Sequence, residues 1–476
     1  NQEIIEINPD GLTGRPDVEM FAETEIILAQ GPVTFSFGDY QMFPNVPLVL
    51  GADPVLPQAV RAREAGEFTI GSQNMLRLFD DVDDPGGDPV LTTAEFQAAI
   101  TMFSEHIRLN LGAPDIMSFQ EVENLNVLQQ LAAQIVLDGG PTYSAHLIEG
   151  NDVGGIDVGY LTDDATIVVN SVAQFGETLL LSVDGSLLHD RPPLVLDATF
   201  VGGGASFPLT VINVHQRSLS GIDDPADGFR VKTKRLEQAE TVAGFIQDLQ
   251  IADPDIRLVV TGDFNAFQFT DGFVDVLGIF TGNLDPLGAE FPGTDLVDPN
   301  LTNEVLSLPV DEQYSFSFAG NPQALDHMLT SVTASAFVTD FQFARGNADS
   351  PDSLFDDLST TLRASDHDGL VLFLVADSDV DGVPDAEDVC PGTLIPEDVP
   401  TVTLGFFRYA LTDNDTTFDT RVPWWFPITP PTFTTEDTAG CSCDQIIDEL
   451  NLGNFQRKFG CGLIVMKVWK HIVDGL

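Results

Sequence analysis

The stretch RLVVTGDFNAFQ, Arg257 to Gln268, joins an apolar, partly β-branched run to a glycine, an acid and an amide. Such a composition is typical of a buried strand, and Gly262 marks the point where the strand ends. Because successive side chains of an extended chain point to opposite faces, Asp263 and Asn265 share one face. The stretch therefore predicts a buried strand with a carboxylate and an amide side by side at its end.

Seven more runs are predicted as strands because they are short, apolar and bounded by polar or turn-forming residues. They are residues 68–74, 115–124, 156–162, 193–200, 209–216, 324–331 and 368–376. Residues 92–112 and 232–250 place apolar side chains at i, i+3 and i+4, which predicts two helices. Many short strands with few helices favour an α/β fold of two stacked sheets covered by helices.

The chain of 476 residues is predicted to hold four units. Residues 1–66 form a partial β module and a Pro-rich linker, and residues 67–376 carry the alternating strands and helices. Residues 377–392 are an acid-rich loop, and residues 393–476 form a Cys-containing module.

The charge of the chain is one-sided, with 74 acids against 20 Lys plus Arg and a net charge of -54. Such a surface repels itself at low ionic strength and is tolerated best where salt screens it. We therefore expect a marine or halophilic source.

Salt should stabilise this protein. Raising NaCl from about 0.1 M to about 1 M shortens the Debye length from about 10 Å to about 3 Å, which weakens the repulsion among the acids. Thermal unfolding and an activity assay at both concentrations test this, with Tm expected to rise and activity to hold or rise. A loss of both on adding salt would contradict the halophilic interpretation.

The four cysteines, Cys390, Cys441, Cys443 and Cys461, all lie in the last quarter of the chain. A clustered, even set favours two disulfides in an exported protein, with a metal site as the alternative. Cys441 and Cys443 are too close in sequence to pair, so Cys390 is expected to bond one of them and Cys461 the other. No apolar run reaches the ~18 residues of a membrane span. We expect a secreted extracellular or periplasmic protein whose signal peptide is absent from this chain.

Polar residues also stand at the ends of the other predicted strands. They are Asn74, Glu121, Arg191, His215, Asp326, Asp366 and His367. Each alone is explained as a turn former or a solvated cap. Together they supply carboxylates suited to a hard divalent cation, and imidazoles that can orient or deprotonate a water. This inventory predicts metal-assisted hydrolysis of phosphodiester bonds.

The ordered motifs QN, QEVEN, NVH, GDFNA, LDH and SDHD, between Phe68 and Val375, resemble the endonuclease/exonuclease/phosphatase superfamily, which includes pancreatic DNase. The resemblance implies a four-layer α/β sandwich with the site at one edge of the paired sheets. It implies that Asn74, Glu121 and Asp366 hold Mg²⁺ or Mn²⁺. It also implies the remaining roles. Asp263 orients or deprotonates the attacking water, and Asn265, His215 and Arg191 contact the phosphate. His367, backed by Asp326, acts in acid/base catalysis or in transition-state stabilisation.

Two positions depart from the family pattern. Leu76 stands where some members carry a further acid, which leaves the number of catalytic metals open. His327 follows Asp326 where many relatives carry an aromatic residue, and we interpret it as a packing histidine.

The segments SFGDYQMFP (36–44) and RVKTKRLEQAE (230–240) resemble large secreted bacterial nucleases of this superfamily. Arg230, Lys232, Lys234 and Arg235 form either a solvated helix start or a phosphate-facing patch. We expect a secreted nuclease that acts mainly on DNA and possibly on RNA. The alternatives are hydrolysis of a lipid or small phosphoester, and a non-catalytic calcium-binding matrix protein.

The segment DSDVDGVPDAEDVCP, which begins at Asp377, has the oxygen-ligand spacing of a calcium loop. Its expected Ca²⁺ ligands are Asp377, Asp379, Asp381, the Val383 carbonyl, Asp385 and Asp388. The segment also resembles a thrombospondin type 3 repeat, and the alternative is an acidic linker.

Overall fold

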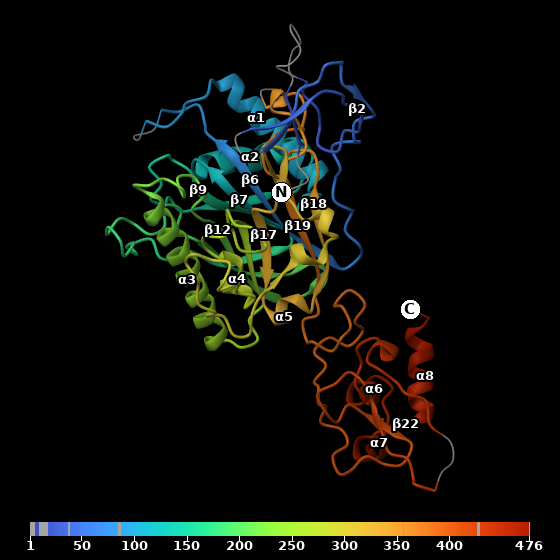
Figure 1. Ribbon diagram of the computed structural model, residues 1–476. Coiled ribbons are helices and arrows are strands. Elements are labelled where there is room, and N and C mark those ends of the chain that lie inside the picture. Colours follow the sequence, from blue (N-terminus) through green and yellow to red (C-terminus); the bar gives the residue numbers. More distant parts are fainter. Residues whose placement is uncertain are drawn as a thin grey trace.

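The fold is built on two packed sheets of six strands each, in a computed structural model that describes residues 5–8, 18–36, 39–83, 87–355, 357–425 and 429–475 (Figure 1). One sheet has the order β10 (Ile167–Gln174), β11 (Leu194–Phe200), β12 (Phe207–His215), β13 (Leu258–Asp263), β17 (Asp326–Thr330) and β14 (Thr302–Asn303). The other has the order β18 (Val338–Ala344), β19 (Gly369–Val375), β6 (Glu67–Leu78), β7 (Ile116–Val122), β9 (Asp157–Asp163) and β8 (Tyr143–Leu147).

Helices cover the outer faces of both sheets. They are α1 (Thr93–Glu105) with its π-helical extension (His106–Asn110), α2 (Leu125–Leu137), α3 (Gly228–Ala252), α4 (Val276–Thr281) and α5 (Val332–Ser335). One buried cluster joins α1 and α2 to the β6–β7 sheet, a second fills the space between the sheets, and a third joins α3 and α4 to the β12–β13 sheet. The expected four-layer α/β sandwich is confirmed.

Short elements complete the described chain. They are β1 (Ile5–Ile7), β2 (Ile26–Leu28), β3 (Val33–Ser36), β4 (Asp39–Met42), β5 (Val49–Leu50), β15 (Phe316–Phe318), β16 (Asn321–Gln323), β20 (Arg408–Ala410), β21 (Asp419–Thr420), β22 (Cys461–Gly462), and 3₁₀ turns at Gly202–Gly204, Glu304–Ser307, Val310–Glu312, Asp352–Leu354 and Glu436–Thr438. In the 36–44 segment, Phe37 and Gly38 lie outside the described residues.

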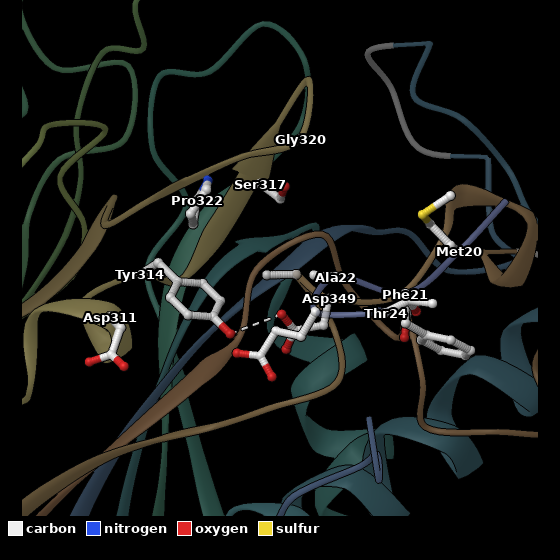
Figure 2. Close-up of a pocket in the computed structure, with 13 residues that line it drawn as sticks. Met20, Phe21, Ala22, Thr24, Asp311, Tyr314, Ser317, Gly320, Pro322 and Asp349 are labelled. Atoms are coloured by element: carbon white, nitrogen blue, oxygen red, sulfur yellow. Dashed lines mark hydrogen bonds between the residues drawn. The ribbon is translucent and has the colours of Figure 1, made fainter. Parts of the chain in front are cut away.

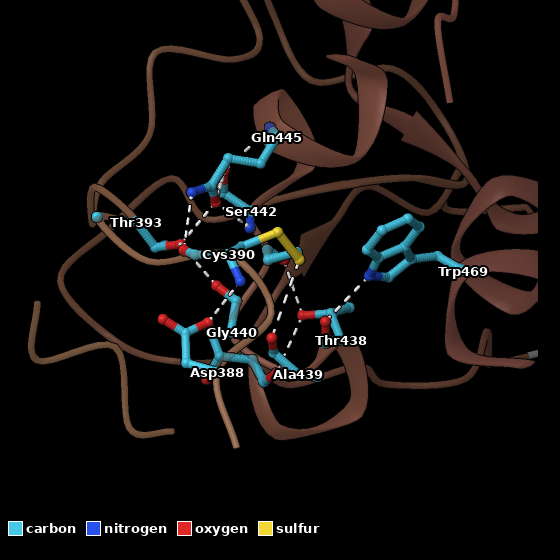
Figure 3. Close-up of a disulfide and its surroundings, with 12 residues drawn as sticks. Asp388, Cys390, Thr393, Thr438, Ala439, Gly440, Ser442, Gln445 and Trp469 are labelled. Carbon is cyan, nitrogen blue, oxygen red and sulfur yellow. Dashed lines mark hydrogen bonds between the residues drawn. A yellow bond between two sulfur atoms is a disulfide. The ribbon is translucent and has the colours of Figure 1, made fainter. Parts of the chain in front are cut away.

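The C-terminal module has a core of its own and two disulfides. Its helices are α6 (Cys443–Glu449), α7 (Asn454–Phe459) and α8 (Leu463–Val473). Cys390 pairs with Cys441 (Figure 3), and Cys443 pairs with Cys461, which confirms the two expected disulfides. Among the described residues, no helix is long and apolar enough to span a membrane.

Two pairs of parallel strands bring the polar residues at their ends close together. β6 pairs in parallel with β7 so that Asn74 lies opposite Gln120, next to Glu121. β12 pairs in parallel with β13 so that His215 lies opposite Asp263, and β17 adds Asp326 beside Asp263. Since the carboxyl ends of parallel strands meet at one edge of a sheet, these side chains come together.

Gly262 is needed for the close approach of β12 and β13. Its φ is 130°, and a Cβ built on it would lie 2.1 Å from the Val214 carbonyl oxygen. Gly262→Ala should therefore destabilise the protein by about 2–5 kcal/mol through backbone strain and overpacking. Urea unfolding provides the measurement.

Gly244→Ala is the matched control for this prediction. Gly244 lies inside α3 and faces open space, so Ala should stabilise the helix by about 0.5–1 kcal/mol. Equal stability of the two variants would contradict the close approach at Gly262.

Candidate functional site

The polar strand ends open into one cleft of about 850 Å³. Its lining includes Glu121, Arg191, His215, Asp263, Asn265, Asp366 and His367. Asn74 and Asp326 lie directly behind these residues and hydrogen-bond to them. The structure thus brings together all the residues that were predicted for the catalytic site.

Asn74 and Glu121 stand at matching irregularities in neighbouring strands. The β6–β7 register shifts between Asn74 and Leu78, and Leu76, Arg77 and Glu121 have φ values of 48°, 59° and 59°. Positive φ is rare for these residue types, and such strain gathers at functional sites. Asn74 Nδ2 lies 3.3 Å from Glu121 Oε1 and 3.2 Å from Asp263 Oδ2, so one amide orients both carboxylates.

Asp263 is held rigidly at the end of β13. Its Oδ1 accepts from the Asn265 backbone N–H at 2.7 Å, and its Oδ2 accepts from Asn265 Nδ2 at 2.9 Å. Burial, followed by the charge of Asp326, raises the pKa of Asp263 to about 7. A carboxyl with such a pKa is suited to accept a proton near neutral pH.

The side-chain amide hydrogens of Asn265 are engaged in hydrogen bonds within the protein. Its Nδ2 donates to Asp263 and also to the Gln216 carbonyl oxygen at 3.2 Å. The structure therefore gives Asn265 a positioning function toward Asp263. The expected phosphate contact of Asn265 stays a prediction, and it requires one of these hydrogen bonds to be exchanged.

His367 and Asp326 form a buried pair. His367 Nδ1 lies 2.6 Å from Asp326 Oδ2, which also accepts from Ser315 Oγ at 2.6 Å. Burial alone would lower the pKa of His367, but the carboxylates of Asp326, Asp366 and Asp263 raise it well above its usual range. Asp326 therefore holds a protonated imidazole whose Nε2 points toward the cleft, 3.9 Å from Asp366 Oδ1.

His215 differs from His367 in its charge. Burial, and then the positive charges of Arg191 and His367, lowers the pKa of His215 well below its usual range. Its Nε2 lies 3.7 Å from Glu121 Oε1 and 3.6 Å from Asp263 Oδ2. One cleft thus holds a neutral and a protonated imidazole, which is a pairing suited to separate acid and base functions.

The donor set of the cleft fits a divalent cation. Burial raises the pKa of Glu121, and Asp326 Oδ1 and Asp366 Oδ1 are buried without a partner among the described residues. Asp263, Asp326 and His367 also place side-chain atoms within 4.8 Å of one another, but a protonated His367 leaves only the two carboxylates as donors. Carboxylate oxygens of this kind are the ligands that Mg²⁺ and Mn²⁺ prefer. Asn74 was expected as a ligand, but its Oδ1 already accepts from the Leu76 N–H at 2.9 Å.

Arg191 is held at the wall of the cleft. Its Nη1 bonds Asp152 Oδ2 at 2.6 Å, and its Nη2 donates to the Gln216 carbonyl oxygen at 3.3 Å. Its Nε is buried without a partner among the described residues. The phosphate contact expected for Arg191 stays a prediction.

Two further arginines of the cleft were missed by the sequence analysis. Among the described Lys and Arg residues between 67 and 376, only Arg77, Arg217 and Arg257 form no ion pair, and the first two line the cleft. Arg77 stands three residues after Asn74, but nothing in that spacing indicates the bulge that exposes it.

The basic cluster at the start of α3 is neutralised by acids. Its pairs are Arg230 with Asp184, Lys232 with Glu290, Lys234 with Asp190 and Arg235 with Asp271. Of the two interpretations of this cluster, the ion pairs favour the structural one over a phosphate-facing patch.

His327 packs in the core as expected. Its Nε2 bonds the Ala266 carbonyl oxygen at 2.8 Å, and its Nδ1 lies 3.1 Å from Asn303 Nδ2. Burial lowers its pKa, so the ring is neutral and serves the packing of β17.

A separate cavity of about 450 Å³ lies between the N-terminal residues 20–24 and the β15–β16 hairpin (Figure 2). Tyr314 Oη donates to Asp349 Oδ1 at 2.9 Å, while Asp349 Oδ2 is buried without a partner among the described residues. Phe316 of the hairpin lines the cleft and Ser317 lines this cavity, so the hairpin separates the two.

The loop that begins at Asp377 gathers three of its acids. Asp377, Asp379 and Asp381 place carboxylate oxygens within 4.8 Å of one another. One oxygen each of Asp379, Asp381 and Asp388 is buried without a partner among the described residues. Burial, and then neighbouring groups, raises the pKa of Asp381 to about 7, and burial raises that of Asp388 to about 6. Such desolvated carboxylates fit a Ca²⁺ site.

The expected Ca²⁺ ligand Asp385 is engaged elsewhere. Both of its oxygens accept hydrogen bonds from Ser378, at 2.8 Å from the backbone N–H and 2.6 Å from Oγ. Asp388 lies beside Gly440 at the disulfide, where it accepts from the Cys390 N–H at 2.7 Å (Figure 3). The Cys390–Cys441 disulfide therefore ties the loop to the C-terminal module.

Comparisons with known proteins find similar structures only. No family model matches the chain, and no curated protein matches it. Similar solved structures include an endonuclease/exonuclease/phosphatase from Bacteroides vulgatus (15% identity, 65% of this chain and 99% of that chain, TM-score 0.42). The human Nocturnin catalytic domain with bound sulfate anion (15%, 66% and 97%, 0.40) and a mannosyl-6-phosphatase from Bacteroides thetaiotaomicron (14%, 64% and 98%, 0.40) are others.

Metal binding at the cleft should weaken as the pH falls. A cation competes with the protons that the raised pKa values of Asp263 and Glu121 keep bound, so Mn²⁺ affinity should fall steeply below about pH 7. Calorimetric titrations between pH 5.5 and pH 8.5 test this. The part of the Mn²⁺ binding signal that Glu121→Gln removes is assigned to the cleft. This assignment separates binding at the cleft from binding at the loop that begins at Asp377. A pH-independent cleft signal would contradict the assignment.

Proposed function

We propose that this protein is a metal-dependent hydrolase of phosphodiester bonds, with DNA as its main substrate and RNA as a possible one. The observation that carries the proposal is the arrangement at Asp263. This carboxyl is fixed by Asn265, has a pKa raised to about 7, and shares its cleft with the protonated His367 and the carboxylates of Glu121 and Asp366.

Each group has a defined task in the proposed hydrolysis. Asp263 orients the attacking water and accepts its proton, while Asn265 and Asn74 hold that carboxylate in place. His367, kept protonated by Asp326, donates a hydrogen bond or a proton to the phosphate oxygens. Glu121 and Asp366 would hold a divalent cation, whose charge would stabilise the phosphate in the transition state.

The substrate proposal rests on unpaired positive charge. Arg77 and Arg217 line the cleft without an acidic partner among the described residues, although acids outnumber bases by 74 to 20 in the chain. Cations left free at one place attract a polyanion. A phosphomonoester or a lipid phosphodiester remains the alternative substrate, because the same catalytic groups serve both.

We also propose that the protein is exported and binds Ca²⁺ through the loop that begins at Asp377. The two disulfides support an oxidising compartment. The unpartnered oxygens of Asp379, Asp381 and Asp388 support the cation site.

The catalytic proposal is tested by removing the carboxylate at the strand end. Asp263→Asn should lower the rate of plasmid DNA cleavage in Mg²⁺ or Mn²⁺ by at least ~100-fold, because the water loses its proton acceptor. His367→Ala should abolish cleavage, and EDTA should do the same. RNA and a sphingomyelin analogue are assayed in parallel.

Asp248→Asn on α3 is the matched control, because Asp248 is exposed and should leave the rate unchanged. Near-normal turnover by Asp263→Asn would mean that Asp263 has no catalytic function and that the strand end is only a turn. If the protein hydrolyses the lipid analogue and neither DNA nor RNA, the alternative substrate, a lipid phosphodiester, replaces the proposed nucleic acid.

The calcium proposal is tested by two aspartates of the same loop. Asp381→Asn should weaken Ca²⁺ binding about tenfold or more, because it removes one of the buried oxygens. Asp385→Asn should leave the affinity nearly unchanged, because Ser378 occupies that carboxylate. Calorimetry with Ca²⁺ measures both, and equal losses in the two variants would contradict the assigned ligand set.

A further inference from the structure

A groove of about 450 Å³, lined mainly by apolar side chains and also by the exposed acid Glu95, adjoins the catalytic cleft. Its floor consists of Met75 and Leu78 from β6 and of Ala99, Met102 and Phe103 from α1, all of them buried. Phe355 and Leu358 also line the groove, where Leu358 packs against the same buried cluster and the Phe355 side chain is 48% exposed. The groove thus has an apolar floor and an aromatic ring at its rim.

The groove and the cleft share one residue, Arg77. Among the described residues, it is the only cation that lines both. The bulge between Asn74 and Leu78 holds Arg77 exposed at a φ of 59°. The Arg77 side chain forms no ion pair or hydrogen bond with any residue that the structure describes. The bulge that sets Asn74 in the cleft therefore also sets a free guanidinium at the mouth of the groove.

The occupant of the groove must match both the apolar floor with its aromatic rim and the guanidinium of Arg77 at the mouth. A group bound there presents an anion to Arg77 and an apolar face to Phe355, and it is joined to the phosphate that lies in the cleft. A nucleotide has this chemistry, since its phosphate precedes a flat base that stacks on aromatic and apolar side chains. A base-paired nucleotide has both of its faces covered by neighbours in the duplex, so only an unstacked base fits.

The remaining surface favours a single strand as well. A duplex is bound through many phosphate contacts made by Lys and Arg along an extended face. The basic cluster of α3 is paired with acids, and among the described cations of the cleft only Arg77 and Arg217 lack an acidic partner. The Arg217 guanidinium already donates to Ser218 Oγ and to the Ser220 carbonyl oxygen. One stacked base with a few phosphate contacts requires far less positive charge.

We propose that the groove between α1 and Phe355 binds one unstacked base of a single-stranded polynucleotide, whose adjoining phosphate contacts Arg77. The inference rests on the proposed nuclease function and adds to it a preference for single strands. Phe355 is then a specificity residue, and it does not touch the reacting atoms.

Binding and cleavage of a single-stranded DNA 12-mer test this. One abasic position is moved along the strand, and fluorescence anisotropy in EDTA measures affinity without turnover. The wild type should lose affinity about 5- to 100-fold at one abasic position, fixed relative to the cleavage point found with Mg²⁺. The same strand in a duplex should bind at least about tenfold more weakly.

Variants locate the effect in the groove. Phe355→Ala should weaken binding of the intact strand and erase the difference between intact and abasic strands. Arg77→Gln should weaken both strands alike, because the phosphate is present in each. Phe35→Ala is the control, since Phe35 is also an exposed phenylalanine, on β3, and lines neither cavity.

Three results would overturn the inference. They are equal affinity for all abasic positions, duplex binding as tight as single-strand binding, and an unchanged abasic discrimination in Phe355→Ala. Tighter binding of a long-chain alkyl phosphodiester, lost in Phe355→Ala, would assign the groove to a lipid chain instead. Strand binding with base discrimination but no metal-dependent cleavage would refute the proposed hydrolysis and leave the groove assignment standing.

Discussion

The site depends on two parallel strand pairs that end at the same edge of the sandwich. β6 with β7 and β12 with β13 carry Asn74, Glu121, His215 and Asp263 to one place. This edge requires backbone conformations that few residues tolerate, at Gly262 where β12 approaches and at Glu121 with its positive φ. The rigid sheets enforce these conformations, so the functional groups are held in place before any ligand binds.

Because of this packing, the cleft holds an excess of negative charge that is buried away from water. Asp263 and Glu121 have raised pKa values because they are buried with too few cations nearby, and His367 is protonated because Asp326, Asp366 and Asp263 surround it. Such a cleft is stabilised by a cation from solution. The metal and the substrate phosphate would then each neutralise charge that the protein alone leaves unpaired, at the carboxylates and at Arg77 respectively.

The sequence predicted the strands that carry the site better than those at the sheet edges. The central strands, such as β13, are continuous apolar runs that end in polar motifs, and so they were recognised. β10 and β18 were missed because exposed or half-buried residues interrupt their buried positions, which gives a weak signal. α2 was missed although Asn124 caps its start, because the preceding motif was interpreted as strand up to that residue.

Within the site, ordered motifs identified the carboxylates and imidazoles, but not the partners that decide their function. The engagement of Asn265 by Asp263 and Gln216, and that of Asp385 by Ser378, follow from three-dimensional contacts without a local sequence signal. The cluster at Arg230 was conspicuous in sequence, yet its acidic partners come from distant segments such as the one that holds Asp184. Arg77 was inconspicuous because a strand bulge, which depends on the pairing with β7, determines its exposure.

The most direct test of the central claim is to locate Mn²⁺ by anomalous scattering in crystals of the protein grown near pH 8. The account predicts a peak in the cleft within bonding distance of the carboxylates of Glu121 and Asp366, close to Asp263, and its loss in Glu121→Gln. A map with Mn²⁺ at the Asp377 loop and none in the cleft would contradict the account.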